Sequence, residues 1–89
     1  MRAVISVIGK DMVGILAKVS NACAKANANV TDVTQSVVQD LFAMIMIIDI
    51  DKLNCKLSDL SDTMEKLGEE SGLSIRVMHE DIFNSMHRI

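Results

Sequence analysis

The chain has 89 residues, of which 49% are hydrophobic and 24% are charged, and its net charge at pH 7 is -3. This length fits one compact domain over residues 1–89 and leaves no room for a separate catalytic domain. Nucleic acid is a poor candidate partner, because the chain is acidic, has no Trp or Tyr, and has only two Phe to stack on bases.

The first two predicted elements are a strand and a helix. Residues 2–8 (RAVISVI) are rich in β-branched side chains and end at Gly9, which predicts a strand followed by a turn. Asp11 is a candidate N-cap for a helix over residues 12–26, in which apolar side chains recur at helical spacing. We expect this helix to pack one face on a core.

Two strands should follow after the break at residues 27–29. Residues 30–39 (VTDVTQSVVQ) carry polar side chains on one face, which is typical of an edge strand. Residues 41–50 (LFAMIMIIDI) are mostly apolar at odd-numbered and even-numbered positions alike, which predicts a central strand buried on two faces.

The second half of the chain repeats the helix and strand. Between Asp51 and Gly72 leucines and a methionine recur at spacings of three and four, which predicts a second amphipathic helix that ends at Gly72 in a left-handed conformation. Gly68 should weaken its last turn. Residues 73–80 (LSIRVMHE) predict a fourth strand, and residues 81–89 a short helical turn.

The order β-α-β-β-α-β predicts an α+β protein with the ferredoxin-like fold, in which two helices cover one face of a four-stranded antiparallel sheet. In that topology the first and third strands are central, and these are the strands that are apolar on both faces. Two helices cover only one face, so we expect the other face to meet a second copy of the chain in a homodimer or a higher homo-oligomer.

No membrane segment is predicted, because the longest apolar run, residues 41–48, is much shorter than the ~20 residues that cross a bilayer. No apolar stretch follows Met1 and Arg2 as in a signal peptide, so we expect a cytoplasmic protein. Cys23 and Cys55 are far apart and are expected to be buried thiols rather than a disulfide.

The turn after the first strand reads G-K-D-M-V-G-I-L from Gly9. This segment, together with N-V-T-D from Asn29 and the C-terminal E-D-I-F and M-H-R-I, resembles the ACT domain family, particularly the single-domain bacterial group related to halves of the glycine-cleavage repressor. The resemblance spans essentially the whole chain. It implies a regulatory domain that binds a small molecule, with an amino acid as the expected ligand.

The resemblance places the ligand at a subunit interface, between the first loop and the start of the second strand. The implied site residues are Asp11, Met12, Val13, Gly14, Asn29, Val30, Thr31 and Asp32. Physically, a helix N-terminus attracts a carboxylate and an acidic side chain accepts from an ammonium group, so the pair suits a zwitterion. Simpler roles stay open: Asp11 as a helix cap alone, and Gly14 as a small residue for close packing.

Other functions of the same fold find less support. An acylphosphatase-like enzyme would need an arginine in the first loop, which has Lys10 and Asp11 instead, so we expect no enzyme activity. A metal chaperone would need paired cysteines there, and His79, Glu80, Asp81 and His87 match no ligand spacing, so we expect no metal and no cofactor. A protein-interaction module without a ligand stays open, and the regulated partner is unidentified.

Overall fold

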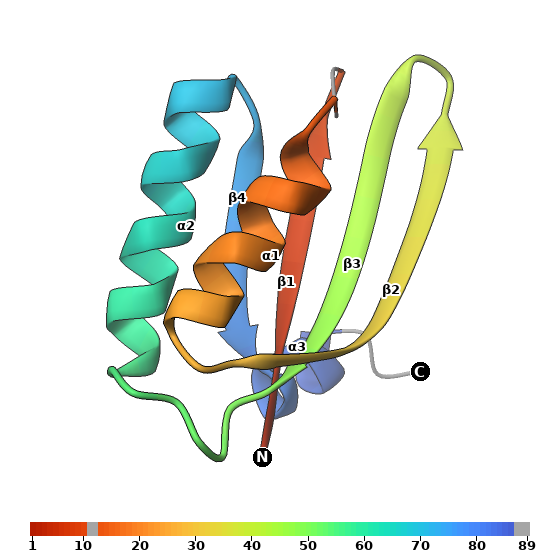
Figure 1. Ribbon diagram of the computed structural model, residues 1–89. Helices are drawn as coiled ribbons and strands as arrows, with labels where there is room; N and C mark the ends of the chain where they lie inside the picture. Colours follow the sequence, from red (N-terminus) through yellow and green to blue (C-terminus); the bar gives the residue numbers. More distant parts are fainter. Residues whose placement is uncertain (11–12, 87–89) are drawn as a thin grey trace.

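The computed structural model describes residues 1–10 and 13–86 of the chain. Strand, helix, two strands, helix and strand follow one another, and a short third helix ends the described chain (Figure 1). The strands are β1 (Arg2–Gly9), β2 (Asn29–Val38), β3 (Leu41–Asp49) and β4 (Ser74–His79), and the helices are α1 (Ile15–Lys25), α2 (Leu57–Ser71) and α3 (Glu80–Met86). The predicted βαββαβ order and ferredoxin-like fold are confirmed.

The four strands form one antiparallel sheet in the order β2-β3-β1-β4. β1 and β3 are therefore central and β2 and β4 are edges, as their composition predicts. Residues paired across antiparallel strands share a face of the sheet. One face holds the centre of the core, formed by Ala3, Ile5 and Val7 of β1 and by Met44, Met46 and Ile48 of β3.

α1 and α2 lie side by side over that face (Figure 1). Each turns an apolar stripe inward, with Ile15, Val19 and Cys23 on α1 and Leu60 and Met64 on α2. Among the described residues, no helix is both long and apolar enough to cross a membrane.

α2 begins later than the predicted region and ends where the sequence indicates. Its first residue is Leu57, and the amide of Lys56 donates to the Asp59 carboxylate at 3.3 Å, which closes the first turn. Leu53 continues the helical spacing but lies before the helix, where it still packs on the core. Gly72 caps the end with φ +71°, so the predicted left-handed residue is confirmed.

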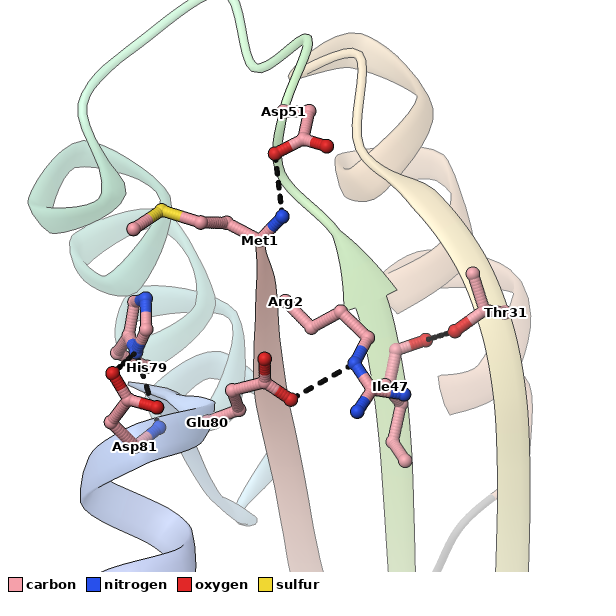
Figure 2. Close-up of polar contacts among 8 residues, drawn as sticks. All are labelled: Met1, Arg2, Thr31, Ile47, Asp51, His79, Glu80 and Asp81. Carbon is pink, nitrogen blue, oxygen red and sulfur yellow. Dashed lines mark hydrogen bonds and ion pairs between the residues drawn. The ribbon is translucent and has the colours of Figure 1, made fainter.

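α3 lies behind the sheet, across from α1 and α2 (Figure 1). The register turns Val4 toward this second face, yet Val4 is only 4% exposed, because α3 packs against β1 and β4. Arg2 fixes the start of the helix, since its Nε donates to the Glu80 carboxylate at 2.9 Å (Figure 2). The second face is thus partly covered by the chain itself, which the two-helix prediction did not include.

Candidate ligand-binding site

The turn between β1 and α1 has a glycine at each end. The helix begins at Ile15, and Gly14 occupies the N-cap position with φ +75°. The prediction that the helix starts at Met12 with Asp11 as its N-cap is wrong, because a residue with left-handed φ interrupts a right-handed helix. Asp11 and Met12 lie outside the described residues, so their part in the site stays a prediction.

The two glycines of this turn serve different purposes. A Cβ at Gly9 would overlap the side chain of Leu73, so a larger residue at position 9 would force that side chain to move. In the part of the chain that the structure describes, no heavy atom lies within 4 Å of a Cβ built at Gly14, so close packing does not explain that glycine and its positive φ does. Residues 1–10 and 13–86 therefore leave the space beside the start of α1 open.

The start of α1 offers a partial positive charge to that open space. Gly14 has no side chain with which to cap the first amide groups, and the first turn holds no acidic residue. Val13 is 91% exposed, so its side chain does not fill the corner. In the described chain this end of α1 can accept an anionic group, as the site prediction requires.

A bulge shapes the start of β2, the other half of the predicted site. Val30 pairs with Ile48 and Asp32 pairs with Ile47, which leaves Thr31 as the extra residue. The Thr31 hydroxyl donates to the carbonyl oxygen of Ile47 at 3.1 Å and so holds the bulge (Figure 2). Thr31 therefore has a structural role, and Val30 is half-buried against the core.

The bulge also brings two polar side chains to one face. Asn29 pairs with Asp49 and Asp32 with Ile47, and both partners belong to the face away from α1 and α2. Without the extra residue, side chains three positions apart would point to opposite faces. Asn29 and Asp32 are exposed, and they are the members of this half with polar groups available for a ligand.

The two halves of the predicted site lie at opposite ends of the sheet. Gly9 is in register with Phe42 next to the β2–β3 turn. The Lys10 Nζ atom lies 3.9 Å from Oδ2 of Asp40 in that turn. Asn29 is in register with Asp49 at the other end of β3. A strand of this length spans roughly 25 Å, so one chain cannot close both halves around one small molecule.

A polar hollow of about 550 Å³ adjoins Asn29, which the sequence did not reveal. Asp49, Asp51, Lys52 and Asn27 line it, and the amide nitrogen of Asn27 donates to the Lys52 carbonyl at 2.8 Å. Asn27 has φ +61°, a conformation that asparagine adopts more readily than most residues. The position of Asn27 just after the end of α1 was the sequence feature that could have indicated this conformation.

A groove of about 660 Å³ runs between α1 and α2 and was also not predicted. Its floor is apolar, with Ala22 and Leu67 half-buried. Its charged lining consists of three lysines and two carboxylates, from Lys18, Lys25, Lys66, Asp59 and Glu70. Within the described chain these lysines form no ion pair, although α2 carries several carboxylates. The groove lies on the outer, helical layer, away from both halves of the candidate site.

Neither thiol belongs to a cluster of potential metal ligands among residues 1–10 and 13–86. Cys23 is buried, and desolvation raises the pKa of its thiol to about 11, so it stays protonated and inert. Cys23 and Cys55 are both free. The predicted burial is confirmed for Cys23, whereas Cys55 is half-buried. The described residues contain no cluster of three or more His, Cys, Asp or Glu side chains that could hold a metal ion.

Comparison with known proteins places this fold in a family. The sequence model of the ACT domain matches residues 2–78. A UPF0237 protein of Methanocaldococcus jannaschii is 48% identical, over 99% of this chain and 98% of its own. An ACT domain protein from Streptococcus pneumoniae is 31% identical and superposes with a TM-score of 0.81 over 93% of each chain.

A structure described as a putative glycine cleavage system transcriptional repressor shares the fold, with a TM-score of 0.71 and 24% identity. The match covers 85% of this chain and 43% of that one, so this fold corresponds to part of that structure. The family model and the similar structure agree with the strand order of the sheet. The chain therefore belongs to the ACT domain family, whose members are regulatory ligand-binding domains.

Proposed function

We propose that this ACT domain is a homodimeric sensor that binds a free amino acid at a site shared by two chains. The observation that carries the proposal is the separation of two chemically complementary half-sites on one chain. The open N-terminus of α1 beside Gly14 suits a carboxylate. Asn29 and Asp32 at the far end of β2 suit an ammonium group.

A two-fold axis is the simplest way to join such half-sites. In an isologous dimer each surface of one chain meets the complementary surface of the other, so the two ends come together twice. Asp11, Met12 and Val13 would then line one side of each site, and Val30 and Thr31 would support the polar groups on the other side. Each dimer would hold two ligands.

The proposed role is regulatory and not enzymatic. The half-sites offer charge complementarity. Cys23, whose thiol pKa burial raises to about 11, belongs to the core and to neither half-site. The signal would pass to another, unidentified protein in the cytoplasm through a ligand-dependent shift between conformations of the dimer. Affinity should be micromolar to millimolar, since a small ligand makes few contacts.

Isothermal titration with each of the common amino acids tests this proposal. We expect one or a few to bind with a stoichiometry of one per chain. At about 100 times its dissociation constant the ligand should add about 2.7 kcal/mol to the free energy of unfolding, which at this length raises Tm by roughly 10 °C or more. No heat and no Tm change with any amino acid would contradict the proposal.

Variants locate the site. Asp32→Asn removes the charge expected to face the ammonium group and should weaken binding at least about tenfold, since a charge-assisted hydrogen bond contributes about 1.5–3 kcal/mol. Asp62→Asn on α2 is the matched control, because Asp62 is exposed and belongs to neither half-site. Equal affinities of the two variants would remove Asp32 from the site.

The groove between α1 and α2 favours a second candidate function. Its apolar floor and its three lysines, which outnumber the lining carboxylates of Asp59 and Glu70, suit an acidic segment of another protein. Such binding would make the chain an interaction module without a small ligand. Binding to such a segment would depend on Lys18 and Lys25. It would be unaffected by Asp32→Asn, which separates this candidate from the sensor.

A further inference from the structure

β4 lies at one edge of the sheet, so one side of its backbone is unpaired within the described chain. The strand order is β2-β3-β1-β4, and the residues of β4 pair with β1 along one side only. In an antiparallel pair, alternate residues direct their N–H and C=O groups away from the partner strand. The outer side of β4 therefore offers main-chain donors and acceptors to an extended segment of another chain.

A hollow of about 360 Å³ follows this free edge. One wall is formed by Ser74, Ile75 and Arg76 of β4. The other wall is formed by Glu65 and Glu69 of α2, which lies beside β4 along this side of the molecule (Figure 1). The hollow thus provides room for a strand next to β4, alongside the outer side of α2.

The two walls of the hollow carry opposite charges. Glu65, Glu69 and Arg76 are exposed, and none of the three forms an ion pair with another described residue. Arg76 is paired with Ser6, which places it on the sheet face away from α1 and α2. The two glutamates belong to α2 and lie on the helical side. An added strand would therefore meet negative charge on one face of the sheet and positive charge on the other.

The spacing of the glutamates matches the repeat of a strand. Glu65 and Glu69 are four residues apart on α2, which separates them by about 6 Å along the helix axis. Side chains two residues apart on a strand share a face and are separated by about 6.8 Å. Two basic residues at alternate positions of an added strand can therefore each face one glutamate. The residue between them turns to the other face, beside Arg76.

We propose that the outer edge of β4 binds an extended segment of a partner protein in which an acidic residue stands between two basic residues. The segment adds a strand to the four-stranded sheet. Main-chain hydrogen bonds to β4 supply affinity, and the basic-acidic-basic pattern supplies specificity. This edge is separate from the β2 half of the proposed amino-acid site, because β2 and β4 lie at opposite edges of the sheet. The inference goes beyond the proposed function and does not depend on the amino-acid ligand.

A second copy of this chain does not match the charges of this edge. Antiparallel pairing of two β4 edges about a two-fold axis would bring the two α2 helices together, so that Glu65 and Glu69 would face the same carboxylates of the other copy. Such like-charge contacts oppose association. The other edge strand offers no basic partner either, since residues 29–38 include no Lys or Arg. The charges therefore favour a segment of a different protein.

Fluorescence anisotropy with the labelled peptide Thr-Val-Lys-Glu-Lys-Val-Thr tests the proposal. We expect a dissociation constant between micromolar and millimolar that rises with salt. At low salt Glu69→Lys should raise it about fivefold, and Glu65→Lys with Glu69→Lys more than about tenfold, since each exposed ion pair becomes a repulsion. Glu70→Lys is the matched control, because it changes the charge equally but lines the groove between α1 and α2. Equal losses in Glu69→Lys and Glu70→Lys would show attraction by net charge alone and overturn the proposal.

Main-chain pairing has its own test. One peptide carries N-methyl groups on its two lysines, and a second carries them on its two valines, which belong to the alternate set of residues. Only one set of amides faces β4, so one peptide should lose binding and the other should keep it. Equal affinities of the two methylated peptides would contradict the addition of a strand.

Amide chemical shifts of the isotopically labelled chain locate the peptide. The largest changes on titration should fall on β4 and on the outer side of α2 near Glu65 and Glu69. Changes centred on β2, or on the groove between α1 and α2, would overturn the proposal, as would the absence of binding. Absence of binding together with β4 shifts that depend on the concentration of the chain itself would assign this edge to a second copy.

Discussion

Gly68 in the last turns of α2 is the position where the packing account is most easily tested, through Gly68→Ala. In an exposed helix interior this change stabilises by about 1 kcal/mol, because alanine has the higher helix propensity. Gly68 is buried, however, and a Cβ there would lie 2.7 Å from the carbonyl oxygen of Leu73 and 3.1 Å from Cγ1 of Ile75. The carbonyl belongs to the backbone that leads into β4, so α2 and β4 must move apart.

The expected effect follows from the difference of these two terms. Overpacking a buried site costs about 1–3 kcal/mol. The nearest atom here belongs to the backbone and cannot rotate away, so we take the upper part of that range, about 2–3 kcal/mol. The gain in propensity offsets about 1 kcal/mol of this cost. We therefore expect Gly68→Ala to lower the free energy of unfolding by about 1–2 kcal/mol and Tm by roughly 5–10 °C. The fold should persist, since the rest of the core is unchanged.

Urea unfolding followed by circular dichroism measures this effect, and the neighbouring residue supplies the control. Glu69 is exposed, so Glu69→Ala should be about 1 kcal/mol more stable than Glu69→Gly. Opposite signs at adjacent positions would show that contact with the start of β4 decides the outcome. A Gly68→Ala variant at least as stable as the native protein would refute the close approach of α2 to β4.

Three further predictions concern the core, the thiols and the N-terminus. Met64 is fully buried, so Met64→Ala should lower the free energy of unfolding by about 2–5 kcal/mol in the same urea assay, and a loss below 1 kcal/mol would contradict its place in the core. Cys23, with a pKa of about 11, should react with a thiol reagent at pH 8 much more slowly than the half-buried Cys55, and equal rates would show that Cys23 is accessible. A hydrogen bond from Asp51 raises the pKa of the Met1 amine above 8.0, so the pair stabilises the fold below that pH and loses its effect as the pH rises through the raised value. The stability difference between native protein and Asp51→Asn should therefore shrink from pH 7 to pH 10, and a difference that is independent of pH would refute the ion pair.

The strand order could be predicted because burial leaves its mark on composition. Residues 41–50 carry mostly apolar side chains on both faces of the strand, as a central strand requires. Residues 30–39 are polar on one face, as an edge strand allows. The end of α2 at Gly72 was also visible, since a left-handed terminal residue strongly favours glycine.

The helix starts could not be read from the same patterns. Asp11 matches the preference for an N-cap, but the backbone of Gly14 delays the helix to Ile15. Leu53 keeps the spacing of a helical stripe because it packs on the same core, although it lies in an irregular segment. Spacing reports which side chains face the core and not which backbone conformation presents them.

The relation between the half-sites needed the structure. A regular strand over residues 29–32 would turn Asn29 and Asp32 to opposite faces of the sheet. The bulge at Thr31 instead brings both side chains to one face. The sequence likewise gave no measure of the separation between Gly14 and Asn29, which makes a second chain necessary for the proposed site. The cover that α3 provides for Val4 was also hidden, because a helix of seven residues has too little periodicity to predict its contacts.

A mixing experiment tests the shared site most directly. Val13→Glu should disable the loop half, because its carboxylate would repel the ligand's carboxylate at the start of α1. Asp32→Ala should disable the β2 half, so neither homodimer should bind the amino acid selected by titration. When the two variants are unfolded, mixed in equal amounts and refolded together, half of the dimers should be mixed, and each should hold one intact site. We expect titration of the mixture to recover about one quarter of the native binding capacity with native affinity. Recovery of no binding, or full binding by either variant alone, would contradict a ligand held between two chains.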